Sequence, residues 1–218
     1  GLLLLAIAFA LAGATLTNSL MRGWQYDMLD RAVENLVGHV KVQASEYRDD
    51  PNMAHSFALP ANYEPKIGGV EVAGWAPRIK VPAVILSERQ SRGVQLVGID
   101  PARENISFFS ELAFAGETLA DIDDGRIVIG AELARQLQTA VGRKLVVLSQ
   151  GADGKNRERG FRIAGTFDAD GTSLEKAFAF TGLAATQAFL GDRSSDSTPP
   201  LVTEVSLLLA DELRRNDA

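Results

Sequence analysis

The first 21 residues of this 218-residue chain carry no charge, and residues 2–16 are almost entirely apolar. About 20 apolar residues in a helix span the hydrocarbon core of a bilayer, so this run predicts a membrane-spanning helix, truncated at its start. Apolar residues continue at every fourth position from Leu16 to Met28, with polar residues between them, as in an amphipathic helix. Gly38 then stands where a helix commonly ends. We therefore expect one helix over residues 1–37, whose second half is a stalk outside the bilayer.

A cleaved signal peptide is the alternative interpretation of this segment. Ala10-Leu11-Ala12 resembles a cleavage site, although no basic region precedes the apolar run. The helical pattern continues well past this point, which favours the membrane helix. In that case Trp24 and Tyr26 lie near the lipid–water boundary, where such rings are enriched. A mature N-terminus just after Ala12 or Ala14 would contradict the prediction.

Composition excludes some functions. The chain has 22 basic and 28 acidic residues, and a net charge of −6 disfavours non-specific binding to nucleic acid. The absence of cysteine excludes disulfides and thiolate metal sites, but it is compatible with both a reducing cytosol and a periplasm. A hydrophobic content of 46% is sufficient for a packed core after the stalk.

After Gly38 the pattern changes from helical to alternating. Strand-rich stretches with brief helices predict an α+β fold. Pro77 and Pro82 interrupt one apolar stretch, which suggests edges or bends. The expected short helices are 130–137 and 182–190. The expected strands are 39–44, 70–79, 83–87, 93–99, 126–129, 144–149, 160–167 and 201–209.

No residue pattern points to catalysis or metal binding. The two histidines, His39 and His55, are too few and too separated for a metal cluster. The sequence around Gly154-Lys155-Asn156 lacks the first glycine and the hydroxyl residue of a phosphate-binding loop. The acidic turn 121–125 has its glycine in the wrong position for a calcium loop. We therefore expect no catalytic residue, no cofactor and no bound metal, so the chain is not expected to be an enzyme.

An ordered set of segments carries a family resemblance that covers nearly the whole chain. In this order the segments resemble the MacB-like periplasmic core domain of FtsX-type ABC transporter permeases, and they are most similar to the lipoprotein-releasing permeases. The segments are Gly38-His39-Val40-Lys41-Val42, Gln95-Leu96-Val97-Gly98-Ile99-Asp100-Pro101, Ile127-Val128-Ile129-Gly130-Ala131-Glu132-Leu133-Ala134, Val141-Gly142-Arg143-Lys144-Leu145 and Phe161-Arg162-Ile163-Ala164-Gly165-Thr166-Phe167.

The resemblance implies a domain organisation and a location. The transmembrane helix and stalk of residues 1–37 are followed by a porter-like α/β-sandwich subdomain, built from residues 38–105 and 182–218. A small strand-rich subdomain, residues 106–181, is inserted into it. The domain lies between the first two of four membrane helices, on the periplasmic side of the inner membrane.

The resemblance also implies partners and a function. The implied partners are a cytoplasmic ABC ATPase, a second permease subunit, identical or different, and a periplasmic carrier or effector protein. The implied function is mechanical coupling of ATP hydrolysis to the release or export of a lipoprotein or amphiphilic substrate. The alternative is an FtsX-like signalling or scaffold domain that regulates a partner such as a cell-wall hydrolase. A membrane-tethered enzyme is the third hypothesis, and it lacks a visible nucleophile–base set.

In lipoprotein-releasing permeases a hairpin in the inserted subdomain of one subunit recruits a soluble carrier. The matching hairpin here is 150–159, which we expect to be exposed and mobile. It lacks the proline and the apolar residues of the carrier-recruiting loop, which argues against carrier recruitment by this subunit. The candidate partner-binding residues are Gln150, Asp153, Lys155, Arg157 and Arg159.

Overall fold

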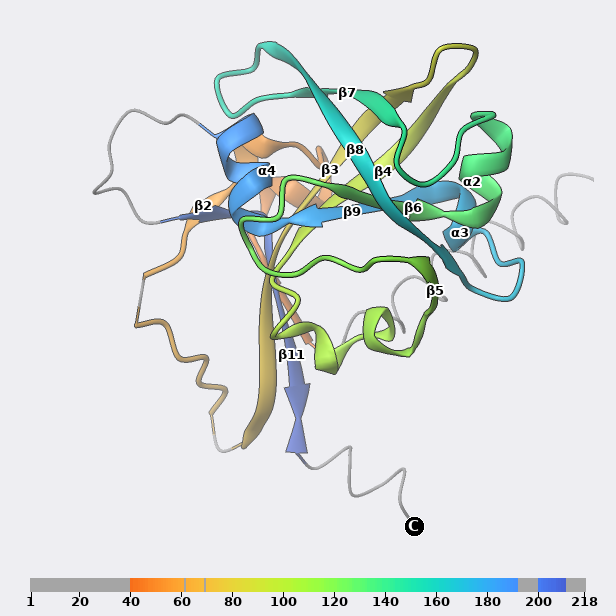
Figure 1. Cartoon of the computed structure of the whole chain (residues 1–218). Coiled ribbons are helices and arrows are strands. Elements are labelled where there is room, and N and C mark those ends of the chain that lie inside the picture. The colour runs from red at the N-terminus through yellow and green to blue at the C-terminus, as the bar shows by residue number, and fades with distance from the viewer. Residues whose placement is uncertain (1–39, 61, 69, 192–199, 211–218) are drawn as a thin grey trace, which may run out of the picture. The chain divides into compact units, whose positions relative to one another are not determined.

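The computed structural model describes residues 40–60, 62–68, 70–191 and 200–210 (Figure 1). These residues lie in one compact unit of the chain. The membrane and stalk helix predicted over residues 1–37 lies outside the described ranges. Within those ranges, no helix combines the length and the apolar character that a bilayer crossing requires.

One mixed sheet of nine strands organises the described residues. Six of its strands close into a ring, because β7 pairs with β8 on one side and with β3 on the other. The pairs β4–β9 and β6–β8 are parallel, and the other four pairs of the ring are antiparallel. In spatial order the ring strands are β3 (Val72–Leu86), β4 (Ser91–Ile99), β9 (Phe178–Gly182), β6 (Ile127–Gly130), β8 (Asn156–Asp168) and β7 (Lys144–Gln150).

Two strands extend the sheet beyond the ring along the first half of β3 (Figure 1). β11 (Glu204–Leu209) pairs with residues 72–78 of β3, and β1 (Val40–Gln43) pairs with β11. The first and last strands of the large sheet are therefore neighbours. The remaining strands are β5 (Ala113–Gly116), which pairs with β8, and the separate pair β2 (Phe57–Ala58) and β10 (Leu201–Val202).

The core fills the interior of the ring. Alternate residues of β3, from Ile79 to Ile85, point inward and are buried, as the period of two requires. Leu145 and Val147 of β7 and Phe161 and Ile163 of β8 belong to the same cluster. Three helices complete the core: α2 (Ala131–Gln136), α3 (Leu174–Ala177) and α4 (Leu183–Leu190). Four short 3-10 helices lie in the loops: η1 (Glu46–Arg48), η2 (Met53–His55), η3 (Glu104–Ile106) and η4 (Phe108–Glu111).

The predicted break between strands 70–79 and 83–87 is wrong, because β3 runs through both prolines. The Lys80 N–H points to the side on which β11 pairs, and it donates to Oγ1 of Thr203, the residue just before β11. By alternation, the missing N–H of Pro82 faces the same side, in the gap between the ends of β11 and β7. Pro77 faces the opposite side, beyond Ile99, the last residue of β4. Neither proline therefore removes a bond that another strand would have made.

The mixed α+β class is confirmed, with a large sheet and few helices. The sequence did not predict β9, which is buried along its whole length and therefore shows no alternation. Strands from both expected subdomains, 38–105 with 182–218 and 106–181, pair within the same sheet. The boundaries of these subdomains, and the porter-like architecture of the first, remain predictions.

Candidate functional site

The predicted hairpin is present, and its strands are longer than expected. β7 and β8 pair from Lys144 opposite Arg162 to Gln150 opposite Asn156, which leaves a five-residue tip, 151–155. The Gly151 N–H donates to the Lys155 carbonyl at 2.8 Å, and the Gln150 side-chain amide donates to the Gly154 carbonyl at 2.8 Å. These bonds give the tip a defined shape.

Four of the five candidate residues gather at this tip. Asp153 accepts a hydrogen bond from the Lys155 N–H at 3.1 Å and forms an ion pair with Arg157 at 3.1 Å. The backbone N–H of Lys155, helped by the nearby cations, lowers the pKa of the Asp153 carboxyl. The Lys155 side chain is 82% exposed and lies 3.9 Å from Asp153. Lys155 is therefore the most accessible charge of the tip that the structure describes.

Arg159, the fifth candidate, has a different environment. Its guanidinium donates to the Ala185 carbonyl in α4 at 3.0 Å and lies over the Phe161 ring, 5.0 Å from its centroid. The tip is also attached to this helix, because the Ala152 N–H donates to the Leu190 carbonyl at 2.9 Å. Arg159 thus fixes the hairpin to α4. A partner-binding role for the five residues, and mobility of the tip, remain predictions.

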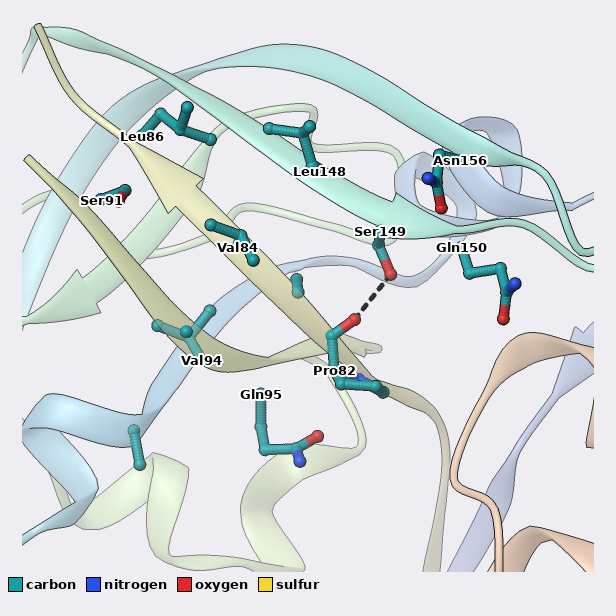
Figure 2. A pocket seen from close by; sticks show the side chains of 13 residues that line it. Pro82, Val84, Leu86, Ser91, Val94, Gln95, Leu148, Ser149, Gln150 and Asn156 are labelled. Atoms are coloured by element: carbon teal, nitrogen blue, oxygen red, sulfur yellow. Dashed lines mark hydrogen bonds between the residues drawn. The ribbon is translucent and has the colours of Figure 1, made fainter.

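An open groove of about 830 Å³ lies beside the tip end of the two hairpin strands, on the outer face of β3, β4 and β7 (Figure 2). The sequence analysis did not identify it. Val84 stands opposite Leu148 of β7 on one side and Gly93 of β4 on the other. Val84 is 43% exposed, and Val146, which stands opposite Leu86 on the same face, is 40% exposed. The outer face therefore presents apolar side chains to solvent.

Polar groups mark the end of the groove near the hairpin tip. The Ser149 hydroxyl donates to the Pro82 carbonyl at 2.8 Å, and the Gln150 and Asn156 side chains lie nearby (Figure 2). Gln95 also lines the groove, and its Oε1 is buried without a hydrogen-bond partner in the described part of the chain. A buried acceptor without a partner costs free energy.

The outer face beyond the groove is basic. Lys144 lies two residues before Val146 on β7, and it stands directly opposite Arg162 of β8. Neither of these cations lines the groove, and the acidic Glu158 stands opposite Leu148, which does. Like charges in directly opposed positions destabilise a sheet. Arg143 and Lys144 also line a separate polar cleft of about 340 Å³ with Arg89. The hairpin segments 87–92 and 143–162 together carry eight basic and three acidic residues, a net charge of +5 in a chain of net charge −6.

A buried ionic cluster joins β3, β11 and η3. Arg78, only 4% exposed, forms two hydrogen bonds to the Glu104 carboxylate, at 2.7 and 2.8 Å. It also donates to Glu204 at 3.4 Å and to Ser206 Oγ at 3.0 Å. Burial opposes the charged form of Arg78, but the bonds to the two carboxylates outweigh it and raise its pKa. The sequence analysis missed this cluster, although a lone arginine within an apolar strand was a visible signal.

The acidic turn before β6 forms a capping structure. Asp124 accepts hydrogen bonds from the Ala120 and Arg126 N–H groups, each at 3.0 Å, and forms an ion pair with the Arg126 side chain at 2.8 Å. Asp121 bonds the Asp123 N–H instead, at 2.9 Å. Among the described residues, no three or more His, Cys, Asp or Glu side chains are grouped as metal ligands.

The Asp124 interactions predict a dependence of stability on pH. The hydrogen bond from Arg126 lowers the pKa of the Asp124 carboxyl from 3.8 to about 2. Because the pKa of Asp124 is lower in the folded state, its charged form stabilises the fold at pH values above the unfolded-state pKa of about 4. This stabilisation is lost as the pH falls from about 4 through 2. We expect Asp124→Asn to lower the free energy of unfolding by about 2 kcal/mol at pH 7 and by less than half of that near pH 2.

Urea unfolding at several pH values checks this prediction. Asp123→Asn, in the same turn and at an exposed position, is the matched control and should change stability by less than about 0.5 kcal/mol. A loss at Asp124 that stays constant between pH 7 and pH 2 would contradict the assignment.

The family model described as "MacB-like periplasmic core domain" matches residues 1–216. No curated protein matches the chain in sequence.

Two solved structures are similar to the chain. The extracellular domain of the noncanonic ABC-type transporter YknZ, from Gram-positive bacteria, is 16% identical, with a TM-score of 0.49 over 81% of this chain and 88% of that one. A domain of a provisionally assigned permease protein from Porphyromonas gingivalis is 19% identical, with a TM-score of 0.39 over 70% of this chain and 68% of that one.

Proposed function

The chain belongs to the MacB-like periplasmic core domain family, and we propose that it is the extracytoplasmic part of an ABC transporter permease that releases or exports a lipoprotein or amphiphilic substrate. The match over residues 1–216 is the observation that carries this proposal. In this function the domain performs no covalent step. A separate ATPase subunit hydrolyses ATP in the cytoplasm, and the domain transmits the resulting movement.

The sheet topology supports mechanical transmission. On the family resemblance, one membrane helix precedes β1 and the next follows β11. These two strands are neighbours in the sheet, so both membrane helices would apply force to the same edge of the sheet. β11 is hydrogen-bonded to β3, a 15-residue strand about 50 Å long. β3 continues into the ring, where it pairs with β7, the first strand of the candidate hairpin.

Hydrogen-bonded strands and a buried ion pair make this path stiff. Arg78 connects β3 to Glu204, the first residue of β11, so the two strands are joined by side chains as well as by backbone bonds. A displacement of β11 should therefore move the ring and its hairpin as one body. This predicts that movement of the membrane helices changes the release of substrate at the ring.

Reconstitution tests the proposed function. The complete permease and its ATPase subunit, in proteoliposomes that contain a fluorescent triacylated lipopeptide, should release the lipopeptide in an ATP-dependent manner. An ATPase subunit without its catalytic base should abolish release. If ATP changes the activity of a cell-wall hydrolase but never moves the lipopeptide, the signalling alternative is correct and the transport proposal is wrong.

The hairpin tip is the proposed contact for a periplasmic partner. Lys155→Ala combined with Arg157→Ala should slow release in this assay about three- to tenfold and reduce its salt dependence, because exposed charges act mainly on association rates. Arg159 is left unchanged, because its bond to α4 is structural. The control is Arg135→Ala, an exposed arginine on α2 that lies outside the hairpin. Equal release rates for both variants would contradict a role for the tip.

A further inference from the structure

The polar cleft of about 340 Å³ lies at the end of the ring where β3 turns into β4 and where α2 leads into β7. Three basic side chains and one acidic side chain line it, which gives the lining a net charge of +2. These residues are Arg89, Arg143, Lys144 and Glu88. The other lining residues are polar except for Ala140, so the cleft is suited to a charged ligand and not to an apolar one.

The three cations of the cleft have no carboxylate partner. Among the described residues none of them forms an ion pair, and Arg89 instead donates to Gln138 Oε1 at 3.3 Å. Lys144 also stands directly opposite the like charge of Arg162. An anion in the cleft would offset this repulsion. Arginines elsewhere in the same part of the chain do pair with carboxylates: Arg103, Arg126, Arg135 and Arg157.

The end of α2 does not account for these cations. Basic side chains near the end of a helix can bond its last carbonyl groups. Here the carbonyls of Leu133, Ala134 and Arg135 accept backbone N–H groups of the following turn. The Leu137 carbonyl accepts the Ser87 hydroxyl at 2.7 Å, which also joins the two loops that form the cleft. These four carbonyls are therefore satisfied without the three cations.

The backbone of Gln138 is strained, and its side chain holds one of the cations. Gln138 has a φ of 52°, in the left-handed region that favours glycine. It follows the last residue of the α2 cap, in a turn closed by the bond from the Thr139 N–H to the Ala134 carbonyl at 3.0 Å. Glycine is usual at this position. A glycine would relieve the strain but would lose the amide oxygen that accepts from Arg89.

The loop that carries Arg143 is fixed to β8 by backbone bonds. The Gly142 N–H donates to the Ile163 carbonyl at 2.8 Å, and the Ile163 N–H donates to the Arg143 carbonyl at 2.9 Å. The backbone on both sides of the cleft is therefore in place before a ligand arrives. A preformed site binds more tightly, because little ordering has to accompany binding.

We propose that this cleft binds a doubly charged phosphate group. Such a group balances the net charge of +2, whereas a single carboxylate leaves half of it. The planar guanidinium groups of Arg89 and Arg143 can each donate two parallel hydrogen bonds to phosphate oxygens. The cleft has roughly ten times the volume of about 30 Å³ that a water molecule occupies, so it has room for the molecule that bears the phosphate. That molecule is a small phosphate ester or a lipid headgroup.

Titration calorimetry with the full 218-residue chain in a neutral detergent tests the proposal. The probe is glycerol 3-phosphate, which carries about two negative charges at neutral pH, and the comparison ligand is dimethyl phosphate, which carries one. Sodium chloride keeps the ionic strength constant. Glycerol 3-phosphate should bind at least about tenfold more tightly than dimethyl phosphate.

A short-chain lipid with the same headgroup identifies the source of the phosphate. Dihexanoyl phosphatidic acid should bind in either case, because its phosphate is also a monoester. An affinity at least about tenfold above that of glycerol 3-phosphate would assign the cleft to a lipid headgroup. An equal affinity would assign it to a soluble ester.

Three variants locate the site. Arg143→Gln combined with Lys144→Gln should weaken glycerol 3-phosphate at least about tenfold. Lys155→Gln combined with Arg157→Gln is the matched control, since it removes the same charge at the other end of the hairpin strands, and it should change the affinity less than about twofold. Gln138→Gly should weaken binding about three- to tenfold without lowering the thermal midpoint of unfolding, because it relieves strain while it releases Arg89.

Several results would overturn the proposal. These are no binding of glycerol 3-phosphate at tens of millimolar concentration, equal affinities for the two double variants, or dimethyl phosphate binding as tightly as glycerol 3-phosphate. An unchanged affinity in Gln138→Gly would show that Gln138 does not position Arg89. The test measures binding alone, so its outcome is independent of whether the permease releases a lipopeptide.

Discussion

Replacement of Arg78 by methionine is expected to lower the free energy of unfolding by about 3–5 kcal/mol. Methionine fills much of the same space but leaves the Glu104 and Glu204 carboxylates without a counter-charge. Glu104 and Glu204 are each 1% exposed, so water cannot replace the guanidinium. Removing one partner of a buried ion pair is costly for this reason, even where the intact pair itself adds little net stability.

Urea unfolding at pH 7 measures this loss, and two further variants identify its cause. Arg135→Met removes an arginine that is 75% exposed and paired with Glu132, and it should cost less than about 1 kcal/mol. Adding Glu104→Gln to Arg78→Met should recover part of the loss, because it removes one of the unpaired charges. A similar cost for Arg78→Met and Arg135→Met, or no recovery with Glu104→Gln, would contradict the buried-charge account.

The sequence predicted local features well. The alternation in 144–149 and 160–167, with glycines between them, predicted the β7–β8 hairpin, and the strands run further into it than expected because charged residues on a pleated strand can point to solvent. The helices predicted at 130–137 and 182–190 also formed, as α2 and α4. In each case the pattern depended on neighbouring residues alone.

The features that the sequence did not predict depend on distant parts of the chain. The ring closes through β7 and β3, which lie about 60 positions apart, and no local pattern specifies that pairing. The continuity of β3 through Pro82 depends on where β11 ends and β7 begins. The candidate site shows the same limit. The sequence predicted the charged tip of the hairpin, but it did not predict that Arg159 bonds to Ala185 in α4. It also did not predict the groove, which exists only where three strands meet.

A flexible insertion between the domain and the membrane is expected to uncouple ATP hydrolysis from release. In the complete permease, Gly-Ser-Gly-Ser inserted between Ala210 and Asp211 places a flexible linker directly after β11. This is where the proposed path of force enters the sheet. Gly/Ser segments behave as flexible coils and transmit little force. We expect ATP hydrolysis to stay within about twofold of the unmodified complex, while release of the lipopeptide falls at least tenfold.

The same insertion between Glu88 and Arg89 is the control, because this exposed turn joins β3 to β4 away from the membrane side of the path. It should leave release within about twofold. Unfolding of the isolated domain should change by less than about 1 kcal/mol for either insertion, since lengthening a surface connection by a few residues costs little.

The ratio of lipopeptide molecules released to ATP molecules hydrolysed, measured in proteoliposomes for the two insertion variants, tests the central claim most directly. A domain that transmits force through β11 and β3 predicts a ratio at least tenfold lower for the insertion after Ala210 than for the insertion after Glu88. Equal ratios for the two variants would show that movement of the membrane helices does not reach the substrate through this domain, and the mechanical account would be wrong.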